Sequence, residues 1–222
     1  MPAEATLDMV QQRRAEIVDA AERCVKAQGL HQLKLRDVAR ESGKSLGNLY
    51  NYFQNKEAIV EALVERQTQA FLEMLRENES DKELDRDKRT RLCIERVVDA
   101  YLDPESVRIS IFIASEALVN PRVREIKLKA DQRLRNYLLE HIAGDMRENG
   151  AEPDLKLLTA QIAISRAFLE ALRGTILFMP DLDREVLRKV VVDRLILMVQ
   201  CDVASWRGIE LESVIRETIG RG

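Results

Sequence analysis

The sequence is poor in the residues that build sheets. Aromatic residues make up only 5% of the 222 residues, and there are nine glycines and five prolines. Strands favour aromatic side chains and need frequent turns, so this scarcity favours helices. Neither a strand pattern nor an internal repeat competes with the helical spacing of the apolar residues. The sequence therefore predicts an all-α protein.

Cysteine and long apolar runs are scarce as well. Cys24, Cys93 and Cys201 are far apart and odd in number, which excludes a disulfide framework or a zinc-ligand spacing. The first residues lack the cationic start and apolar run of a signal peptide, and no stretch approaches 18 apolar residues. We therefore expect a cytoplasmic protein that makes no use of a membrane.

The residues of known catalytic centres are also missing. His31 and His141 are the only histidines, and they are isolated from each other. The chain has no nucleophile elbow, phosphate-binding glycine loop or metal-ligand cluster. The sequence predicts that the protein is not an enzyme and has no catalytic residues, no metal site and no cofactor.

What the chain has in quantity is helical patterning. Hydrophobic residues make up 45% of the sequence, enough for a sizeable core. Asn120-Pro121 and Asp103-Pro104 are helix-start signals, because proline is well tolerated at the first helical position. A charged stretch from Glu77 to Arg91 marks a loop or helix end. Apolar spacing predicts long helices at about 7–28, 56–78, 91–102, 104–118, 121–149, 154–178, 183–206 and 209–219.

Residues 36–56 have the pattern of a helix-turn-helix. Apolar residues at 35, 38 and 39 give a short helix one buried face, and Ser42-Gly43 then breaks it. Gly43 suits a left-handed turn, and Ser45 suits the N-cap of a second helix that begins at Leu46. On that helix Leu49 and Phe53 face inward, flanked by Leu46 and Tyr50.

The outward face of the second helix is expected to carry Gly47, Asn48, Asn51 and Tyr52. Asparagine can bond adenine in the major groove, glycine permits close approach, and tyrosine hydroxyls can reach phosphates. Five basic and two acidic side chains between residues 34 and 56 leave a local charge of +3 in a chain of net charge −3. This stretch is either a DNA-binding surface or an ordinary pair of solvated surface helices.

The run GKSLGNLYNYFQNKEAIVEAL resembles the DNA-binding signature of the tetracycline-repressor (TetR) family. The family's Gly-x-Ser turn, Gly-x-Leu-Tyr-x-(Tyr/His)-Phe-x-x-Lys helix and long connecting helix correspond here to Gly43, Ser45, Gly47, Leu49, Tyr50, Tyr52, Phe53 and Lys56. The resemblance extends over roughly residues 12–65. Lys44 and Leu46 depart from the usual residues, so a relative's operator sequence cannot be copied to this chain.

The resemblance implies two domains and a function. It implies a three-helix helix-turn-helix DNA-binding domain over residues 1–55 and a helical effector-binding and dimerisation domain over residues 56–222. The expected function is a homodimeric repressor that binds a palindromic double-stranded DNA operator and is released by a small-molecule effector. The expected DNA-binding residues are Lys34, Arg36, Lys44, Ser45, Leu46, Gly47, Asn48, Tyr50, Asn51, Tyr52 and Lys56.

The last two long helices are apolar around most of their circumference. Such helices either lie deep inside the subunit or pack against a partner as half of a four-helix bundle. We expect a homodimer. The predicted interface residues are Leu158, Ile162, Leu169, Leu172, Val191, Leu195 and Val199.

A polar stripe crosses the first of these helices. Arg166, Glu170 and Arg173 either form a row of salt bridges at the dimer surface or include an arginine that faces an anionic effector. Family members hold a small ligand among the middle helices. The residues expected to line such a cavity are Tyr101, Phe112, Arg166 and Phe168.

Three other functions remain open at this stage. A transcriptional activator and a ligand-independent DNA-binding protein of the same fold share every sequence feature given above. A helical protein–protein adaptor is the third alternative, and it differs from a repressor in that it does not bind duplex DNA sequence-selectively.

Overall fold

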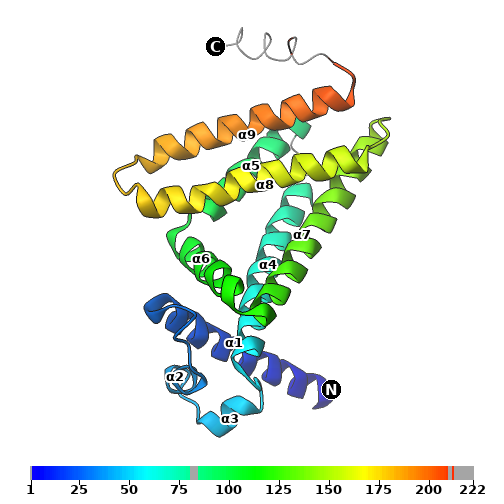
Figure 1. Ribbon diagram of the computed structural model, residues 1–222. Helices are drawn as coiled ribbons and strands as arrows, with labels where there is room; N and C mark the ends of the chain where they lie inside the picture. Colours follow the sequence, from blue (N-terminus) through cyan, green and yellow to red (C-terminus); the bar gives the residue numbers. More distant parts are fainter. Residues whose placement is uncertain (1, 81–84, 210–211, 213–222) are drawn as a thin grey trace. The chain divides into compact units, whose positions relative to one another are not determined.

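The computed structural model describes residues 2–80, 85–209 and 212, and its regular structure is helical throughout (Figure 1). Within those residues no strand occurs, and no helix is both long and apolar enough to cross a membrane. The helices are α1 (Pro2–Gln28), α2 (Leu35–Glu41), α3 (Leu46–Tyr50), α4 (Lys56–Ser80), α5 (Arg86–Leu102), α6 (Pro104–Val119), α7 (Pro121–Glu148), α8 (Leu155–Phe178) and α9 (Arg184–Trp206).

Helix boundaries follow short sequence signals. Gly29 has φ +81° and directly follows α1, as expected of a residue that ends a helix. The Asn120 side chain accepts hydrogen bonds from the backbone N–H groups of Arg122 and Val123 and so caps α7. The α5 helix begins at Arg86, earlier than predicted. The helix predicted at 209–219 lies outside the described residues, apart from residues 209 and 212.

The chain packs as two compact units that divide it differently from the boundary expected after residue 55. One unit comprises Met1–Phe71 and Glu105–Gln132, so it contains α1 to α3, most of α4, α6 and the start of α7. The other comprises Leu72–Pro104 and Arg133–Gly222, and it contains α5, α8, α9 and the rest of α7. We call them unit 1 and unit 2.

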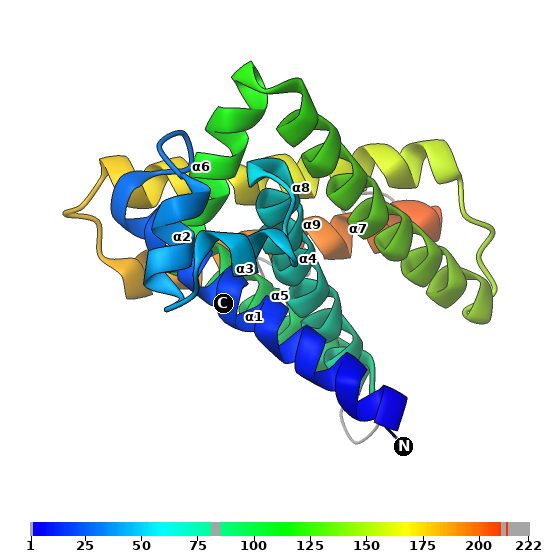
Figure 2. The ribbon, with the colours of Figure 1, turned by 90° about the horizontal axis from the view of Figure 1, so that it is seen from below.

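Unit 1 is built around one continuous hydrophobic core. The α2 helix lies beside both α1 and α3, and Figure 2 shows these three helices together. Leu49 and Phe53 are buried, as predicted, among side chains from α1, α2, α4 and α6. The core residues that surround them include Ile17, Ala21, Val38, Ile59, Leu63 and Ile113.

In unit 2, α5 packs against both α8 and α9. The Trp206 indole N–H donates to the Gln161 side chain at 2.9 Å, and Gln161 donates to Asp202 at 2.8 Å, which joins α8 to α9. Burial raises the pKa of the Asp202 carboxyl despite the hydrogen bond from Gln161. Arg188 of α9 forms two hydrogen bonds to Asp99 of α5.

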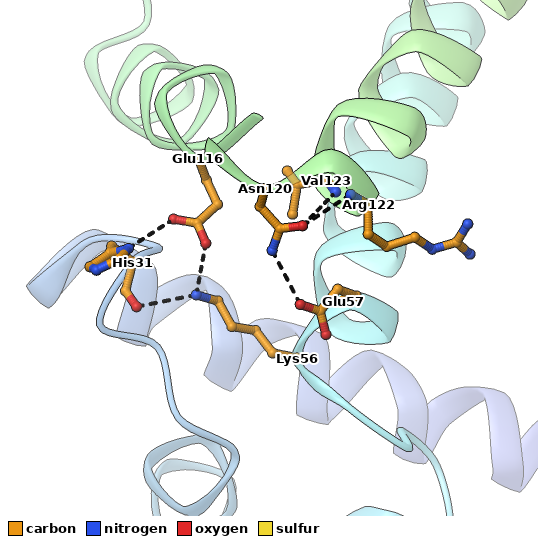
Figure 3. Close-up of polar contacts among 7 residues, drawn as sticks. All are labelled: His31, Lys56, Glu57, Glu116, Asn120, Arg122 and Val123. Carbon is orange, nitrogen blue, oxygen red and sulfur yellow. Dashed lines mark hydrogen bonds and ion pairs between the residues drawn. The ribbon is translucent and has the colours of Figure 1, made fainter. Parts of the chain in front are cut away.

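A buried carboxylate joins α6 to two other segments of unit 1 (Figure 3). One oxygen of Glu116 lies 3.2 Å from Lys56 Nζ, and the other lies 3.3 Å from His31 Nδ1. The Lys56 ammonium also donates to the His31 carbonyl at 3.2 Å. Next to this group, the Asn120 amide donates to Glu57 at 3.2 Å. We call His31, Lys56 and Glu116 the α6 clamp.

Charge pairing within the clamp outweighs burial. Burial alone raises the pKa of the Glu116 carboxyl. The hydrogen bonds and charges of Lys56 and His31 lower this pKa by more than burial raises it, so the net pKa lies below its ordinary value. A depressed carboxyl pKa adds stability above the unfolded-state pKa, and that stability is lost as pH falls through the folded-state pKa.

The backbone conformation of Gly43, in the turn between α2 and α3, generates the first prediction. Replacing Gly43, at φ +66°, with alanine forces a left-handed backbone on a residue with a Cβ and should lower the free energy of unfolding by roughly 1–2 kcal/mol. Gly47→Ala is the matched control, because Gly47 is helical with open space at its Cβ, and it should stabilise by about 0.5–1 kcal/mol. Urea unfolding of both variants measures the difference, and equal effects would contradict the assignment.

The α6 clamp generates the second prediction. Glu116→Gln should lower the free energy of unfolding by roughly 1–3 kcal/mol near neutral pH, because the half-buried Lys56 ammonium loses its anion. The deficit should shrink as the pH falls below the ordinary glutamate pKa and through the lowered pKa of the folded-state carboxyl, where the native Glu116 also becomes neutral. Urea unfolding over a pH series measures this.

Glu125→Gln is the control for the second prediction, because Glu125 pairs with Arg122 and Lys129 on the exposed side of α7. That variant should change stability little at any pH. A Glu116→Gln deficit that is the same at every pH would show that the charge on Glu116 does not stabilise the fold.

Candidate nucleic-acid interface

The turn between α2 and α3 has the local geometry that the sequence predicts. Gly43 has φ +66°, and Lys44 donates its backbone N–H to the carbonyl of Ala39, which closes the end of α2. The Ser45 hydroxyl accepts a hydrogen bond from the Asn48 N–H at 3.1 Å, so Ser45 is the N-cap of α3. These contacts fix where α3 begins.

The exposed face of α3 carries amides and bare backbone. Gly47, Asn48 and Asn51 are exposed, as the sequence predicts, and so are Ser45 and Leu46. These side chains belong to five consecutive helical residues and their two caps. A surface of this kind presents hydrogen-bond donors and acceptors to the solvent.

The two tyrosines exchange the positions expected for them. Tyr50 is exposed, although the sequence places it beside the buried face, and Tyr52 packs against the core of unit 1, although the sequence turns it outward. The reason is that α3 ends at Tyr50. Tyr52 therefore lies in the turn that carries Phe53 into the core, where helical periodicity no longer applies.

Two of the expected DNA-binding cations are paired inside unit 1. Lys44 is 12% exposed and donates to Glu16 of α1 at 2.7 Å. The hydrogen bonds from Lys44 and then Arg13 lower the pKa of Glu16, which keeps this carboxylate ionised. Lys56 is 22% exposed and belongs to the α6 clamp. Lys34 and Arg36 lie exposed at the start of α2.

Arg14 of α1 is a further cation beside α3 that the sequence analysis does not identify. Its guanidinium donates to the Tyr52 carbonyl at 2.8 Å and lies over the Phe53 ring, 4.4 Å from the ring centroid. The residue itself is exposed. This contact spans 38 positions of sequence, so no local spacing could have indicated it.

The residues expected at an effector cavity fall into two groups. Tyr101 is buried in unit 2, where its ring lies under the Arg173 guanidinium at 4.6 Å and Arg173 bonds Glu170 at 2.7 Å. Arg166 and Phe168 are half-buried on the same helix as Arg173. Phe112 instead packs against the core of unit 1, with its ring over Gly29. It does not share a unit with the others.

Six of the seven residues expected at a dimer interface are already buried within one subunit. The exception is Val199, which is half-buried. A side chain that is already buried has little surface left to give to a partner. The large apolar side chains that remain exposed on α8 and α9 are Leu155, Leu157, Ile164, Leu177, Phe178, Val186 and Val190.

The helix-turn-helix region and most of the chain are similar in sequence to bacterial transcriptional regulators. Residues 17–63 match the sequence profile described as bacterial regulatory proteins, tetR family. The chain is 27% identical over 183 residues to ArpR of Pseudomonas putida, a probable HTH-type transcriptional regulator, covering 79% of this chain and 85% of ArpR.

Two solved structures show the same fold. One is a TetR-family regulator of Mesorhizobium loti, with a TM-score of 0.72 at 14% identity, covering 88% of this chain and 97% of that chain. The other is the transcriptional regulator FadR of Bacillus subtilis in complex with stearoyl-CoA, with a TM-score of 0.64 at 18% identity, covering 82% and 97%. Residues 17–63 thus belong to the tetR family of bacterial regulatory proteins, and they contain the helix-turn-helix at residues 35–50.

Proposed function

We propose that the protein is a homodimeric transcriptional repressor that binds a palindromic operator and is released by a small-molecule effector. The observation that carries this proposal is the exposed face of α3, where two asparagine amides follow an exposed glycine. A short helix with such a face fits the major groove, in which each base pair has a distinct pattern of donors and acceptors.

Different residues supply affinity and selectivity in this proposal. Asn48 and Asn51 are exposed and carry amides that can bond an adenine in two places. Lys34 and Arg36 are exposed cations at the start of α2, suited to phosphates, which carry no sequence information. Lys44 is neutralised by Glu16, so it contributes less to phosphate binding than the sequence count of charges implies.

A seven-residue repeat on α8 supports the dimer. Leu157, Ile164, Ala171 and Phe178 are all exposed, with Ile164 at 63% and Phe178 at 82%, and they share one face of the helix. Exposed apolar side chains gathered on one face of a helix are typical of a surface that packs against a partner. Val186 and Val190 extend the apolar surface on α9. We propose that these residues, rather than the buried set, contact the second subunit.

The proposed effector site lies in unit 2 around α5 and α8. Tyr101 and Arg173 form a cation–π pair there, and Glu170 neutralises the arginine within the subunit. The FadR structure, which shares this fold, holds stearoyl-CoA. An effector that binds the DNA-incompetent arrangement more tightly by roughly 1–3 kcal/mol would weaken operator binding about 5- to 150-fold.

Selection from a random duplex library tests the proposal directly. The purified protein should enrich an inverted repeat whose half-sites are about one helical turn, or a multiple of it, apart. Enrichment of a single asymmetric site would contradict a symmetric dimer on DNA. Failure to enrich any duplex would contradict sequence-selective DNA binding altogether.

Arg36 and Asn48 provide the third prediction. Arg36→Ala should weaken binding to selected and random duplexes alike and reduce the slope of log K against log salt by about one. Asn48→Ala should cost roughly 1–3 kcal/mol on the selected duplex alone. Fluorescence anisotropy over a salt series measures both effects. Lys189→Ala, which removes an exposed cation of α9, is the control and should change neither quantity. If Arg36→Ala weakened binding to the selected duplex alone and Asn48→Ala weakened binding to all duplexes, the assignment of Arg36 to phosphates and Asn48 to bases would be wrong.

Ile164 provides the fourth prediction. Ile164→Glu places a charge in the proposed α8 stripe and should convert the dimer to a folded monomer in sedimentation equilibrium at micromolar concentration. Leu128→Glu is the matched control, because Leu128 is an equally exposed apolar residue on α7 of unit 1. That variant should remain dimeric. A wild-type protein that sediments as a monomer would remove the basis of the dimer proposal.

A further inference from the structure

We propose that Glu116 is a positioning residue for DNA binding, and that Lys56 acts on DNA through Glu116 and not as a phosphate ligand. This inference rests on the proposed DNA-binding function. In it, the α6 clamp fixes the orientation in which α3 is held within unit 1. The family signature would by itself assign Lys56 to the DNA surface, whereas the contacts of this chain assign it to the interior of unit 1.

The clamp joins the two ends of the helix-turn-helix. His31 lies in the segment between α1 and α2, just before the motif begins, and Lys56 is the first residue of α4, just after the motif ends. Both are bonded to the one carboxylate of Glu116 on α6, and the Lys56 ammonium also bonds the His31 carbonyl (Figure 3). Movement of α6 relative to either end therefore breaks a charged contact.

Further contacts hold the same helix in place. The Arg108 guanidinium of α6 donates to the carbonyl of Lys26 at 3.0 Å, and the Lys26 ammonium lies 3.1 Å from Glu105 at the start of α6. At the other end of α6, Asn120 bonds Glu57, the neighbour of Lys56. The α6 helix thus contacts the last turn of α1 and the first turn of α4.

Burial makes the pairing of Glu116 and Lys56 difficult to replace. Glu116 is 7% exposed, and its two oxygens are bonded by Lys56 and His31. A DNA phosphate that captured the Lys56 ammonium would leave the carboxylate buried without its lysine, which is strongly unfavourable. Phosphate binding therefore has to compete with a pair that is already formed and is screened little by salt.

A charge swap separates the two roles of Lys56. The variants are Lys56→Met, Glu116→Gln and the double variant Lys56→Glu with Glu116→Lys, each measured by anisotropy on the duplex selected by the wild-type protein and on a random duplex. A positioning role predicts that each single variant weakens binding to the selected duplex about tenfold with an unchanged salt slope. The swap restores an ion pair, so it should recover binding to within about threefold of the wild type.

A phosphate-ligand role predicts the opposite pattern. Lys56→Met would then lower the salt slope by about one, Glu116→Gln would leave affinity unchanged or higher, and the swap would bind worst because it brings an anion to the phosphate. That pattern would overturn the inference. Arg36→Ala supplies the reference for a lost phosphate contact, and Glu125→Gln supplies the reference for a carboxylate of unit 1 outside the clamp.

Urea unfolding of the variants and duplex selection by the wild-type protein separate a failure of the positioning role from a failure to fold or to bind DNA. Urea unfolding of each variant fixes conditions in which it is folded, and the swap decides between the roles even where a single variant fails to fold. A wild-type protein that selects no duplex contradicts the proposed function. A wild-type protein that selects a duplex, together with a swap variant that folds but does not recover binding, contradicts the positioning role alone.

Discussion

Burial of Leu49 and Phe53 is the constraint on which the proposed DNA-binding surface depends. A helix of five residues, such as α3, is too short to be stable by itself, so its position comes from the core into which these two side chains pack. The Ser45 cap fixes where the helix starts, and the cation–π contact of Arg14 with Phe53 covers the buried ring from the α1 side. The amides of Asn48 and Asn51 are therefore presented by α1, α2, α4 and α6 together.

The same unit determines which charges are available to a polyanion. Glu16 and Glu116 come from α1 and α6, outside the motif, and they neutralise Lys44 within the motif and Lys56 just after it. Lys34 and Arg36 stay at the surface, and Arg14 joins them near the end of α3. The positive charge of the surface is thus shifted from the middle and end of the motif toward α2 and α1. Phosphate contacts are expected to follow that distribution.

Features that depend on a few neighbouring residues could be predicted from the sequence, whereas features that depend on distant partners could not. The left-handed Gly43, the Ser45 cap and the Asn120-Pro121 helix start are local, and the structure confirms them. The pairing of Lys56 with Glu116 spans 60 positions, beyond the reach of helical periodicity. Helical periodicity indicates that α8 is apolar on both sides, but it cannot tell which side α5 covers. The residues predicted at the dimer interface are therefore mostly ones that are buried within the subunit.

The central claim is that the exposed face of α3 reads the major groove of a symmetric site. Methylation interference on the selected duplex tests it most directly, because methyl groups can be placed in one groove at a time. Methylation of guanine N7 or adenine N6, in the major groove, should block binding at two clusters of positions about one helical turn, or a multiple, apart. Interference confined to adenine N3, in the minor groove, would contradict it.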